Sequence, residues 1–340
     1  MTAAAILGCE GLRLTAQEKA FFRDVSPWGF ILFARNIDTP DQVRALCAEL
    51  REAAGRNAPI LIDQEGGRVA RLKAPHWREW PRMDDLLART LPEANVNVAL
   101  RVRFRLIAAE LHALGIDVNC VPMVDVPAPG ADPIVTTRVM GADPAQIARR
   151  GRQAAEALMD GGVLPVVKHV PGHGRATADS HLDLPVVDAD LATLRATDFL
   201  PFRELADLPM MMTAHIVYPA LDPENCATHS PRCIDAIRGD IGFHGLLMTD
   251  DLGMHALKGS FRERAEASFA AGCDVALHCS GKMAEMRDLA EGLRALDGPA
   301  AARAAAAEAA RTPPHPVDLE ELDRRHLYLV GEAEYEGGKA

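Results

Sequence analysis

Eight short apolar runs alternate with helix-like segments along the chain, and this alternation constrains the possible folds more than any other feature. Each run is followed by a polar loop and usually then by a candidate helix. The runs are residues 4–8, 29–33, 59–63, 117–121, 164–169, 210–215, 246–250 and 274–279. Near-continuous apolar strands are typical of parallel strands that are covered on both faces. The alternation therefore predicts an α/β fold, a (β/α)8 TIM barrel, with a doubly wound open sheet as the alternative.

Helix signals and chain length favour a single barrel domain. Residues 39–55 open with a Thr-Pro pair and close on a glycine, and residues 143–162 open with Asp-Pro and close on two glycines. Such residues are typical start and stop signals of α-helices. The 340 residues suit one large barrel, which we expect to span residues 1–300. We expect residues 301–340 to form an alanine-rich helix and a polar tail rather than a separate domain.

Composition and charge narrow the classes of partner. Hydrophobic residues make up 48% of the chain and charged residues 25%, as in soluble globular enzymes. The net charge of -11 argues against nucleic-acid binding, although a local basic cluster could still bind an anionic small molecule. The chain shows no signal-peptide pattern and no run of about 18 apolar residues, so we expect no membrane contact. Seven cysteines without a C-x-x-C pair indicate reduced, buried thiols of a cytoplasmic protein.

Titratable side chains concentrate where the predicted strands end. In a barrel the active site is built at the carboxyl ends of the strands, so these residues are the candidates for chemistry. They are Asp63, Glu65, Arg68, Arg71, Arg138, Lys168, His169, His215, Asp250, Asp251 and His278. Structural interpretations are also open: an aspartate can cap a loop, Arg68 and Arg71 can form an exposed face, and Glu65 can pair with Arg68. A strand-end histidine can be a packing residue. The accumulation at one end of the sheet nevertheless favours a functional site.

The segment KHVPGHGRATADSH, residues 168–181, carries more titratable groups than a connecting loop needs. A phosphate-binding loop is disfavoured because the segment completes neither G-x-G-x-x-G nor G-K-[ST]. A metal site stays open, since histidine and aspartate are common ligands in metal-dependent hydrolases. Against a metal, no strand carries H-x-H, and Lys168 would bring a positive charge toward the cation.

Acid/base chemistry is the third possibility for this segment. Asp179 and His181 are spaced i, i+2, so an extended or turn conformation can direct both to one side and let the carboxylate orient the imidazole. Gly172, Gly174, Ala176 and Ala178 would make the loop mobile. Such a loop needs a rigidly held nucleophile, and Asp250, at the end of a buried strand, fits that role.

Four motifs, DQEGGRVARL, KHVPGHGRATADSH, MTAHIVYPALD and MTDDLGMHAL, resemble glycoside hydrolase family 3 in their order and separations. The resemblance covers about residues 5–290 and points to the single-domain bacterial β-N-acetylglucosaminidases of peptidoglycan recycling. It implies a (β/α)8 barrel that uses neither cofactor nor metal. The implied substrate is a muropeptide or amino sugar with non-reducing terminal N-acetylglucosamine, such as GlcNAc-1,6-anhydro-MurNAc with or without peptide. Nothing in the chain resembles the second, sandwich domain of many family members, which favours the hexosaminidase branch over β-glucosidases.

The resemblance also implies roles for individual residues. Asp250 matches the nucleophile of a retaining, two-step mechanism, His181 matches the general acid/base, and Asp179 matches its dyad partner. Two further residues within the motifs, Asp251 and Glu65, are expected to have supporting roles. The positions that hold the non-reducing sugar are matched by Asp63, Arg71, Arg138, Lys168 and His169. The remaining histidine of the loop, His173, is expected to be structural.

Overall fold

The computed structural model describes residues 1–90, 92–131, 133–176 and 184–333, and this part of the chain is organised around one parallel sheet. Within it nine strands are ordered β7-β6-β3-β2-β1-β13-β12-β9-β8. Their bounds are β1 Ala3–Leu7, β2 Pro27–Leu32, β3 Ile60–Ile62, β6 Val118–Asn119, β7 Leu164–Pro165, β8 Val167–Val170, β9 Met210–Thr213, β12 Leu246–Asp251 and β13 Val275–His278. The two ends of this order, β7 and β8, are consecutive in the chain, so the sheet closes into a barrel. The predicted (β/α)8 fold is confirmed.

The barrel closes across a break in the fifth predicted strand. The sequence predicts one strand over residues 164–169, but Val166 separates β7 from β8. The N–H of Val166 donates to the carbonyl of Asn119 at 3.0 Å, and the N–H of Lys168 donates to the carbonyl of Pro122 at 3.0 Å. Because β7 pairs with β6 and β8 pairs with β9, the break lets one segment serve both neighbours. Eight predicted runs therefore give nine strands.

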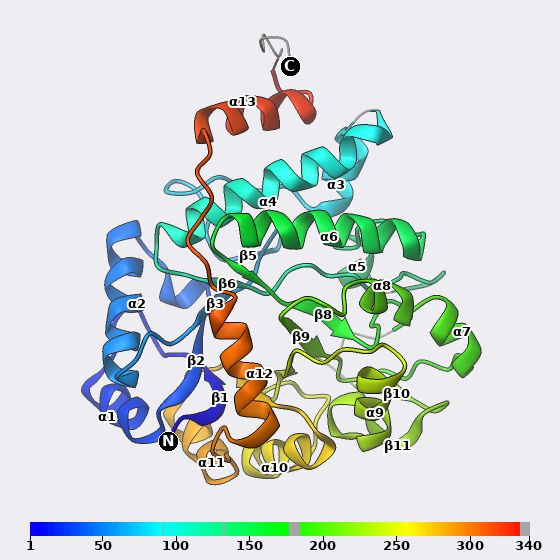
Figure 1. Cartoon of the computed structure of the whole chain (residues 1–340). Coiled ribbons are helices and arrows are strands. Elements are labelled where there is room, and N and C mark those ends of the chain that lie inside the picture. The colour runs from blue at the N-terminus through cyan, green and yellow to red at the C-terminus, as the bar shows by residue number, and fades with distance from the viewer. Residues whose placement is uncertain (91, 132, 177–183, 334–340) are drawn as a thin grey trace.

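Helices surround the barrel, as Figure 1 shows. Their bounds are α1 Ala16–Val25, α2 Pro40–Ala54, α3 Met83–Arg89, α4 Val96–His112, α5 Pro133–Thr136, α6 Pro144–Asp160, α7 Leu191–Ala196, α8 Phe199–Glu204, α9 Pro231–Gly239, α10 Phe261–Ala271, α11 Met283–Glu291, α12 Gly298–Ala309 and α13 Leu319–Leu329, with 3-10 turns at Ala34–Asn36, Glu93–Asn95 and Ala227–His229. The predicted caps are present, since the side chain of Thr39 accepts from the N–H of Gln42 in α2 and that of Asp143 accepts from the N–H of Gln146 in α6.

Two antiparallel hairpins, which the apolar pattern does not predict, follow strands of the barrel. β4, Gln64–Gly66, pairs with β5, Val69–Ala70, after β3, and β10, Val217–Tyr218, pairs with β11, Asp222–Cys226, after β9. Each hairpin begins where its barrel strand ends, so both lie at the carboxyl end of the barrel. The hairpin of β4 and β5 bears on the site described below.

Helix α12 lies across the amino-terminal end of the barrel. Its Ala304 and Ala307 are buried in the same cluster as the barrel-interior residues of β1, β3 and β12. On α12, Arg303 forms an ion pair with Asp274, which immediately precedes β13; Arg303 Nη2 lies 2.5 Å from Asp274 Oδ1. Helix α12 therefore covers the amino-terminal end of the barrel.

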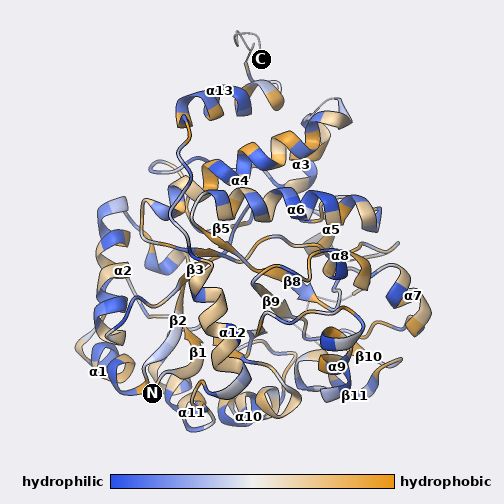
Figure 2. Ribbon diagram, in the orientation of Figure 1, coloured by the Kyte–Doolittle hydropathy of each residue, from blue (hydrophilic) through white to orange (hydrophobic). Residues whose placement is uncertain are grey.

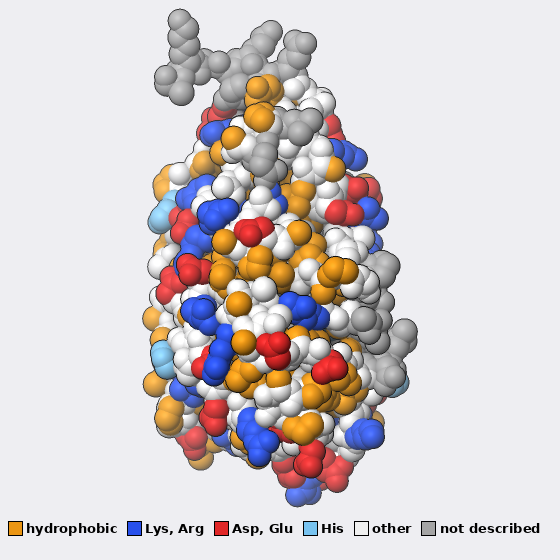
Figure 3. Space-filling model, turned by 90° about the vertical axis from the view of Figure 1, so that its right-hand side faces the viewer, with side chains coloured by type: hydrophobic (Ala, Val, Ile, Leu, Met, Phe, Trp, Pro, Cys, Tyr) orange, Lys and Arg blue, Asp and Glu red, His pale blue; other side chains and the backbone are white. Residues whose placement is uncertain are grey.

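The core and the surface follow the usual division of an α/β barrel. Figure 2 shows hydrophobic segments in the central strands and hydrophilic segments in outer helices such as α7 and α13. On the face drawn in Figure 3, basic and acidic side chains are interspersed with hydrophobic ones. The seven cysteines are buried, free thiols, as predicted. In the described part of the chain, no helix combines the length and the apolar character needed to cross a membrane.

Candidate active site

A cavity of about 290 Å³ lies at the carboxyl end of the barrel. It is bounded by residues of β2, β8, β9, β12 and β13 and by the β4–β5 hairpin. Its titratable lining residues are Asp63, Arg68, Arg71, Asp125, Arg138, Lys168, His169, His173, Asp250, Asp251 and Cys279. The structure thus brings Asp250 together with the five residues predicted to hold a sugar. The predicted dyad, Asp179 and His181, lies outside the described residues.

Asp63 forms two ion pairs at the base of the cavity. Lys168 Nζ donates to Asp63 Oδ1 at 2.8 Å, and Arg71 Nη2 donates to Asp63 Oδ2 at 2.9 Å. Burial alone would raise the pKa of Asp63, but the charges of Lys168 and Arg71 lower it well below its usual value. Burial would likewise lower the pKa of Lys168, and the carboxylates around it raise it instead. Asp63 therefore presents a charged carboxylate that can accept hydrogen bonds from sugar hydroxyls.

Glu65 lies beside the ion pairs of Asp63 and binds Arg138. Arg138 Nε donates to Glu65 Oε2 at 2.8 Å and Arg138 Nη2 to Oε1 at 2.6 Å, while Lys168 Nζ lies 2.7 Å from Oε1. Burial opposes ionisation of Glu65, but the charges of Arg138 and Lys168 outweigh it and lower its pKa to about 2. The sequence suggested an ion pair between Glu65 and Arg68; the structure instead pairs Glu65 with Arg138. Glu65 supports the cavity wall by fixing the Arg138 guanidinium.

Asp125 is a site residue that the sequence analysis missed. Its Oδ2 lies 2.8 Å from His169 Nδ1, and its Oδ1 accepts from the backbone N–H of His173 at 2.5 Å. Burial would raise the pKa of Asp125, but its contact with His169 lowers it, so an ionised carboxylate accepts from His169 Nδ1–H. Because Nδ1 faces Asp125, Nε2 is the ring nitrogen of His169 that is left for a substrate hydroxyl. An aspartate inside the apolar residues 121–126 was the available signal.

Asp250 lies at the end of β12, is only 7% exposed, and lines the cavity. Its Oδ1 accepts from the N–H of Asp251 at 2.8 Å. The side chain of Asp251 accepts through Oδ1 from the N–H groups of Gly253, at 2.8 Å, and Cys279, at 3.1 Å. Asp251 therefore fixes the backbone that carries Asp250, which agrees with the supporting role expected for it.

The strand-end histidines His215 and His278 are fully buried and do not line the cavity. His215 Nε2 donates to the carbonyl of Asp251 at 3.0 Å, and His215 Nδ1 lies 2.8 Å from Thr228 Oγ1. Since a carbonyl only accepts, Nε2 carries the proton and Nδ1 accepts from the hydroxyl. Burial lowers the pKa of His215 and keeps it neutral. Both histidines are therefore packing residues, which was the structural interpretation of strand-end histidines in the sequence analysis.

The described beginning of the loop, residues 172–176, is tightly packed. A Cβ on Gly174 would lie 2.0 Å from the carbonyl oxygen of Val126, and a Cβ on Gly172 would lie 3.1 Å from Cβ of Asp198. At these two positions glycine allows close backbone approach, a role that the sequence analysis did not assign to them. His173, expected to be structural, lines the cavity, and burial together with the nearby His169 lowers its pKa to about 4.

The donor set of the cavity is suited to a polyhydroxylated substrate. Among the described residues, no group of three or more His, Cys, Asp or Glu side chains is placed to hold a metal. Carboxylates, guanidinium groups, an ammonium and two imidazoles line the wall and offer hydrogen-bonding sites for several hydroxyls. The Asp250 carboxylate lines the same cavity, and a carboxylate is one of the groups that can act as a nucleophile.

Comparison with known proteins agrees with this geometry. The glycosyl hydrolase family 3 N-terminal domain matches residues 7–311. The chain is 34% identical to a β-hexosaminidase of Stenotrophomonas maltophilia over 86% of this chain and 87% of that protein, and 37% identical to one of Alkalilimnicola ehrlichii over 81% and 80%. The structure of NagZ from Neisseria gonorrhoeae in complex with N-trifluoroacetyl-D-glucosamine is 30% identical, covers 98% of both chains and superposes with a TM-score of 0.85. The chain therefore belongs to glycosyl hydrolase family 3, in its β-hexosaminidase group.

Proposed function

We propose that the protein is an exo-acting, retaining β-N-acetylglucosaminidase that releases non-reducing terminal N-acetylglucosamine from peptidoglycan fragments. The substrate would be GlcNAc-1,6-anhydro-MurNAc, with or without its peptide. The single observation that carries the proposal is the position of Asp250 in one cavity with Asp63, Lys168 and His169. The bound N-trifluoroacetyl-D-glucosamine of the Neisseria relative supports an amino-sugar substrate. The buried, free thiols support a cytoplasmic location.

The reaction would proceed in two displacements. The Asp250 carboxylate attacks the anomeric carbon, the glycosidic bond breaks, and His181 gives a proton to the leaving oxygen. His181 then removes a proton from water, which displaces Asp250 and restores the β configuration. Asp179 would orient the His181 ring and favour its protonated form. The roles of Asp179 and His181 rest on the family resemblance.

A histidine acid differs from the pair of carboxyl groups that most retaining glycosidases use. The unperturbed imidazole pKa of about 6.5 makes both the acid and the base form available near neutral pH. An enzyme of this kind does not need to bury a glutamate to raise its pKa. This property suits a site whose buried carboxyl groups, Asp63 and Glu65, have lowered pKa values and cannot supply a proton near neutral pH.

The sugar would be held by the polar wall of the cavity. The charged Asp63 carboxylate, the Lys168 ammonium and the Nε2 atom of His169 offer acceptors and donors to its hydroxyls. Arg71 and Arg138 would shape the pocket, since each is already bound to a carboxylate. The buried strand residues Ile31, Met212 and Leu277 line this cavity, so one terminal sugar would enter it and the rest of the substrate would stay at the mouth. This geometry supports exo cleavage.

Trapping the covalent intermediate tests the nucleophile. A slow fluorinated N-acetylglucosaminide should leave one sugar adduct, and peptide mass spectrometry should locate it on Asp250. Asp250→Asn should lose nearly all activity and form no adduct, whereas Asp24→Asn, a change on the exposed face of α1, should react like the parent. An adduct on another residue would contradict the assignment of Asp250 as the nucleophile.

Comparing two aryl glycosides tests the branch of the family. The parent enzyme should release an aryl alcohol from the β-N-acetylglucosaminide much faster than from the matched β-glucoside. A preference for the glucoside would overturn the proposed substrate while leaving the fold and the nucleophile in place.

A further inference from the structure

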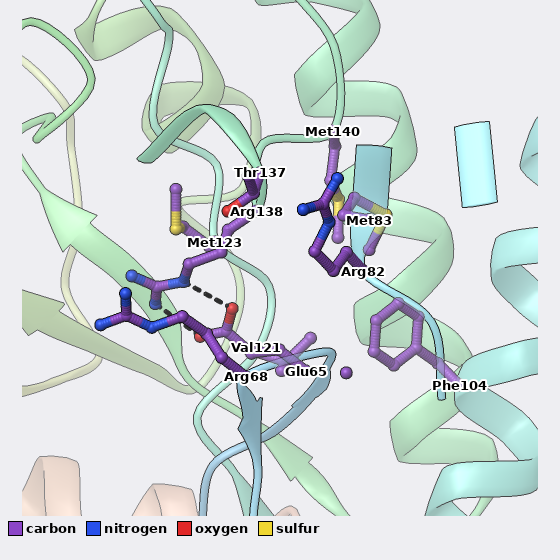
Figure 4. Close-up of a pocket in the computed structure, with 11 residues that line it drawn as sticks. Glu65, Arg68, Arg82, Met83, Phe104, Val121, Met123, Thr137, Arg138 and Met140 are labelled. Carbon is purple, nitrogen blue, oxygen red and sulfur yellow. Dashed lines mark hydrogen bonds and ion pairs between the residues drawn. The ribbon is translucent and has the colours of Figure 1, made fainter. Parts of the chain in front are cut away.

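The hairpin at the mouth of the cavity carries an arginine, Arg68, that the mechanism does not use. Gly67 and Arg68 join β4 to β5, so Arg68 lies at the tip of the hairpin. Arg68 lines both the sugar cavity and a small adjoining pocket, and Figure 4 shows its side chain with those of Glu65 and Arg138. Arg68 is exposed, whereas Lys168 at the base of the cavity is 2% exposed. Arg68 is therefore a residue of the mouth rather than of the base.

The hairpin is firmly anchored. The buried side chain of Gln64 donates to the carbonyl of Leu72 at 3.1 Å and accepts from the N–H of Arg71 at 2.8 Å. The buried Arg103 donates to the carbonyl of Glu65 at 2.6 Å. Gly66 has a φ of +120°, and a Cβ there would lie 1.9 Å from Arg103 Nη2. Because its backbone is fixed on both sides, the hairpin presents Arg68 at a defined place without a large ordering cost on binding.

Among the described residues, no carboxylate pairs with Arg68. The other cations of the cavity wall are matched by carboxylates: Arg71 by Asp63, Arg138 by Glu65, and Lys168 by both. Arg68 forms no hydrogen bond or ion pair with any residue in the described ranges. Within the described part of the chain, the guanidinium at the mouth of the cavity therefore keeps all its donors available.

We infer that Arg68 recognises a carboxylate on the leaving portion of the substrate and so determines which aglycones are cleaved efficiently. The inference rests on the proposed exo cleavage, in which the terminal sugar fills the base and the leaving portion occupies the mouth. A planar guanidinium binds a carboxylate through two parallel N–H···O bonds, and this geometry gives direction as well as charge selectivity. An anion bound at the mouth would pair with Arg68, as Asp63 and Glu65 pair with the cations deeper in the cavity.

A matched pair of substrates tests this inference. The β-N-acetylglucosaminides of 3-carboxyphenol and 3-carbamoylphenol have nearly the same size, and only the first is anionic. The ratio of their kcat/KM values within one enzyme cancels general damage caused by a substitution. The parent should favour the anionic glycoside, and Arg68→Gln should reduce that preference roughly fivefold. Raising the ionic strength should weaken the preference in the parent and leave Arg68→Gln little changed.

The control is Arg23→Gln, which removes one positive charge in the last turn of α1, immediately before β2 and hence at the opposite end of the barrel. It should keep the substrate ratio of the parent. An equal ratio in the parent and Arg68→Gln would overturn the inference, and continued hydrolysis of both glycosides would leave the proposed function standing. Failure of the parent to hydrolyse either glycoside would overturn the proposed function and the inference with it.

Discussion

At the scale of single residues, Asp125 determines which nitrogen of His169 carries the proton. In Asp125→Asn the amide oxygen stays with the backbone N–H groups, so the amide NH2 faces His169 Nδ1 and moves the imidazole proton to Nε2. A donor then replaces the acceptor that faces the substrate. We expect kcat/KM to fall by about 10- to 100-fold, the range typical when a partner that orients a functional histidine is lost.

The control for this change is Asp117→Asn. Asp117 also accepts from a backbone N–H, that of Ile60 at 2.7 Å, but it lies at the amino-terminal end of the barrel. It should change stability without changing kcat/KM. Similar kinetic losses in both variants would show that Asp125 acts only through the fold.

Side-chain chemistry at the site was predictable where it followed a strand. Asp63, Lys168 and Asp250 end apolar runs, and the carboxyl ends of parallel strands converge in space. Asp125 was not predicted as a site residue because it lies within an apolar stretch after β6, past the end of the strand. The partner of Glu65 was also unpredictable, since Arg138 is 73 residues away and its approach depends on how the loop after α5 folds.

At the scale of elements, helices with complete caps were predicted nearly to the residue, as α2 and α6 show. The break within a strand was not predicted. The division between β7 and β8 depends on two different neighbours, and an apolar run of six residues contains no signal for that. The β4–β5 hairpin is likewise stabilised by Gln64 and Arg103 from outside its own short strands.

The glycines at the beginning of the loop, residues 172–176, serve packing, and Gly174 provides the test. A Cβ at this position would lie 2.0 Å from the carbonyl oxygen of Val126, which is backbone and cannot move aside. Gly174→Ala should therefore destabilise the protein by about 1–3 kcal/mol and lower kcat/KM, because residues 172–176 lead directly to Asp179 and His181. Urea unfolding and steady-state kinetics would measure both effects.

A matched glycine distinguishes crowding from a general cost of the substitution. Gly239, at the end of α9, has no atom within 4 Å of its added Cβ, so Gly239→Ala should keep the parent's stability and activity. Normal stability of Gly174→Ala would contradict the close packing of this segment.

At the scale of the whole molecule, α12 links the C-terminal residues to the barrel. Asp274 binds Arg303 of α12 and Arg238 of α9, and it also accepts from the N–H of Leu247 in β12. One buried carboxylate thus joins three elements at the amino-terminal end of the barrel. On this basis we propose that residues 301–340 form no separate folding unit.

Buried histidines should make the stability of the molecule fall as the pH is lowered below neutrality. Burial lowers the pKa of both His173 and His326 from 6.5 to about 4. Between these values the unfolded chain binds more protons than the folded chain, so the free energy of unfolding decreases as pH falls. Each histidine should remove about 2 kcal/mol between pH 7 and pH 5. Glu65, whose pKa is lowered from 4.5 to about 2, should extend the loss to more acidic pH.

Replacing one histidine separates this mechanism from general acid denaturation. His326 is 4% exposed and packs edge-on against Trp80, with ring centroids 5.2 Å apart, so phenylalanine can take its place. His326→Phe should reduce the difference in unfolding free energy between pH 7 and pH 5 by about 2 kcal/mol. His244→Phe, at an exposed position, should keep the parent's difference. Urea titrations at the two pH values measure the difference in unfolding free energy. If this difference is the same in His326→Phe as in the parent, His326 is not a source of the pH dependence.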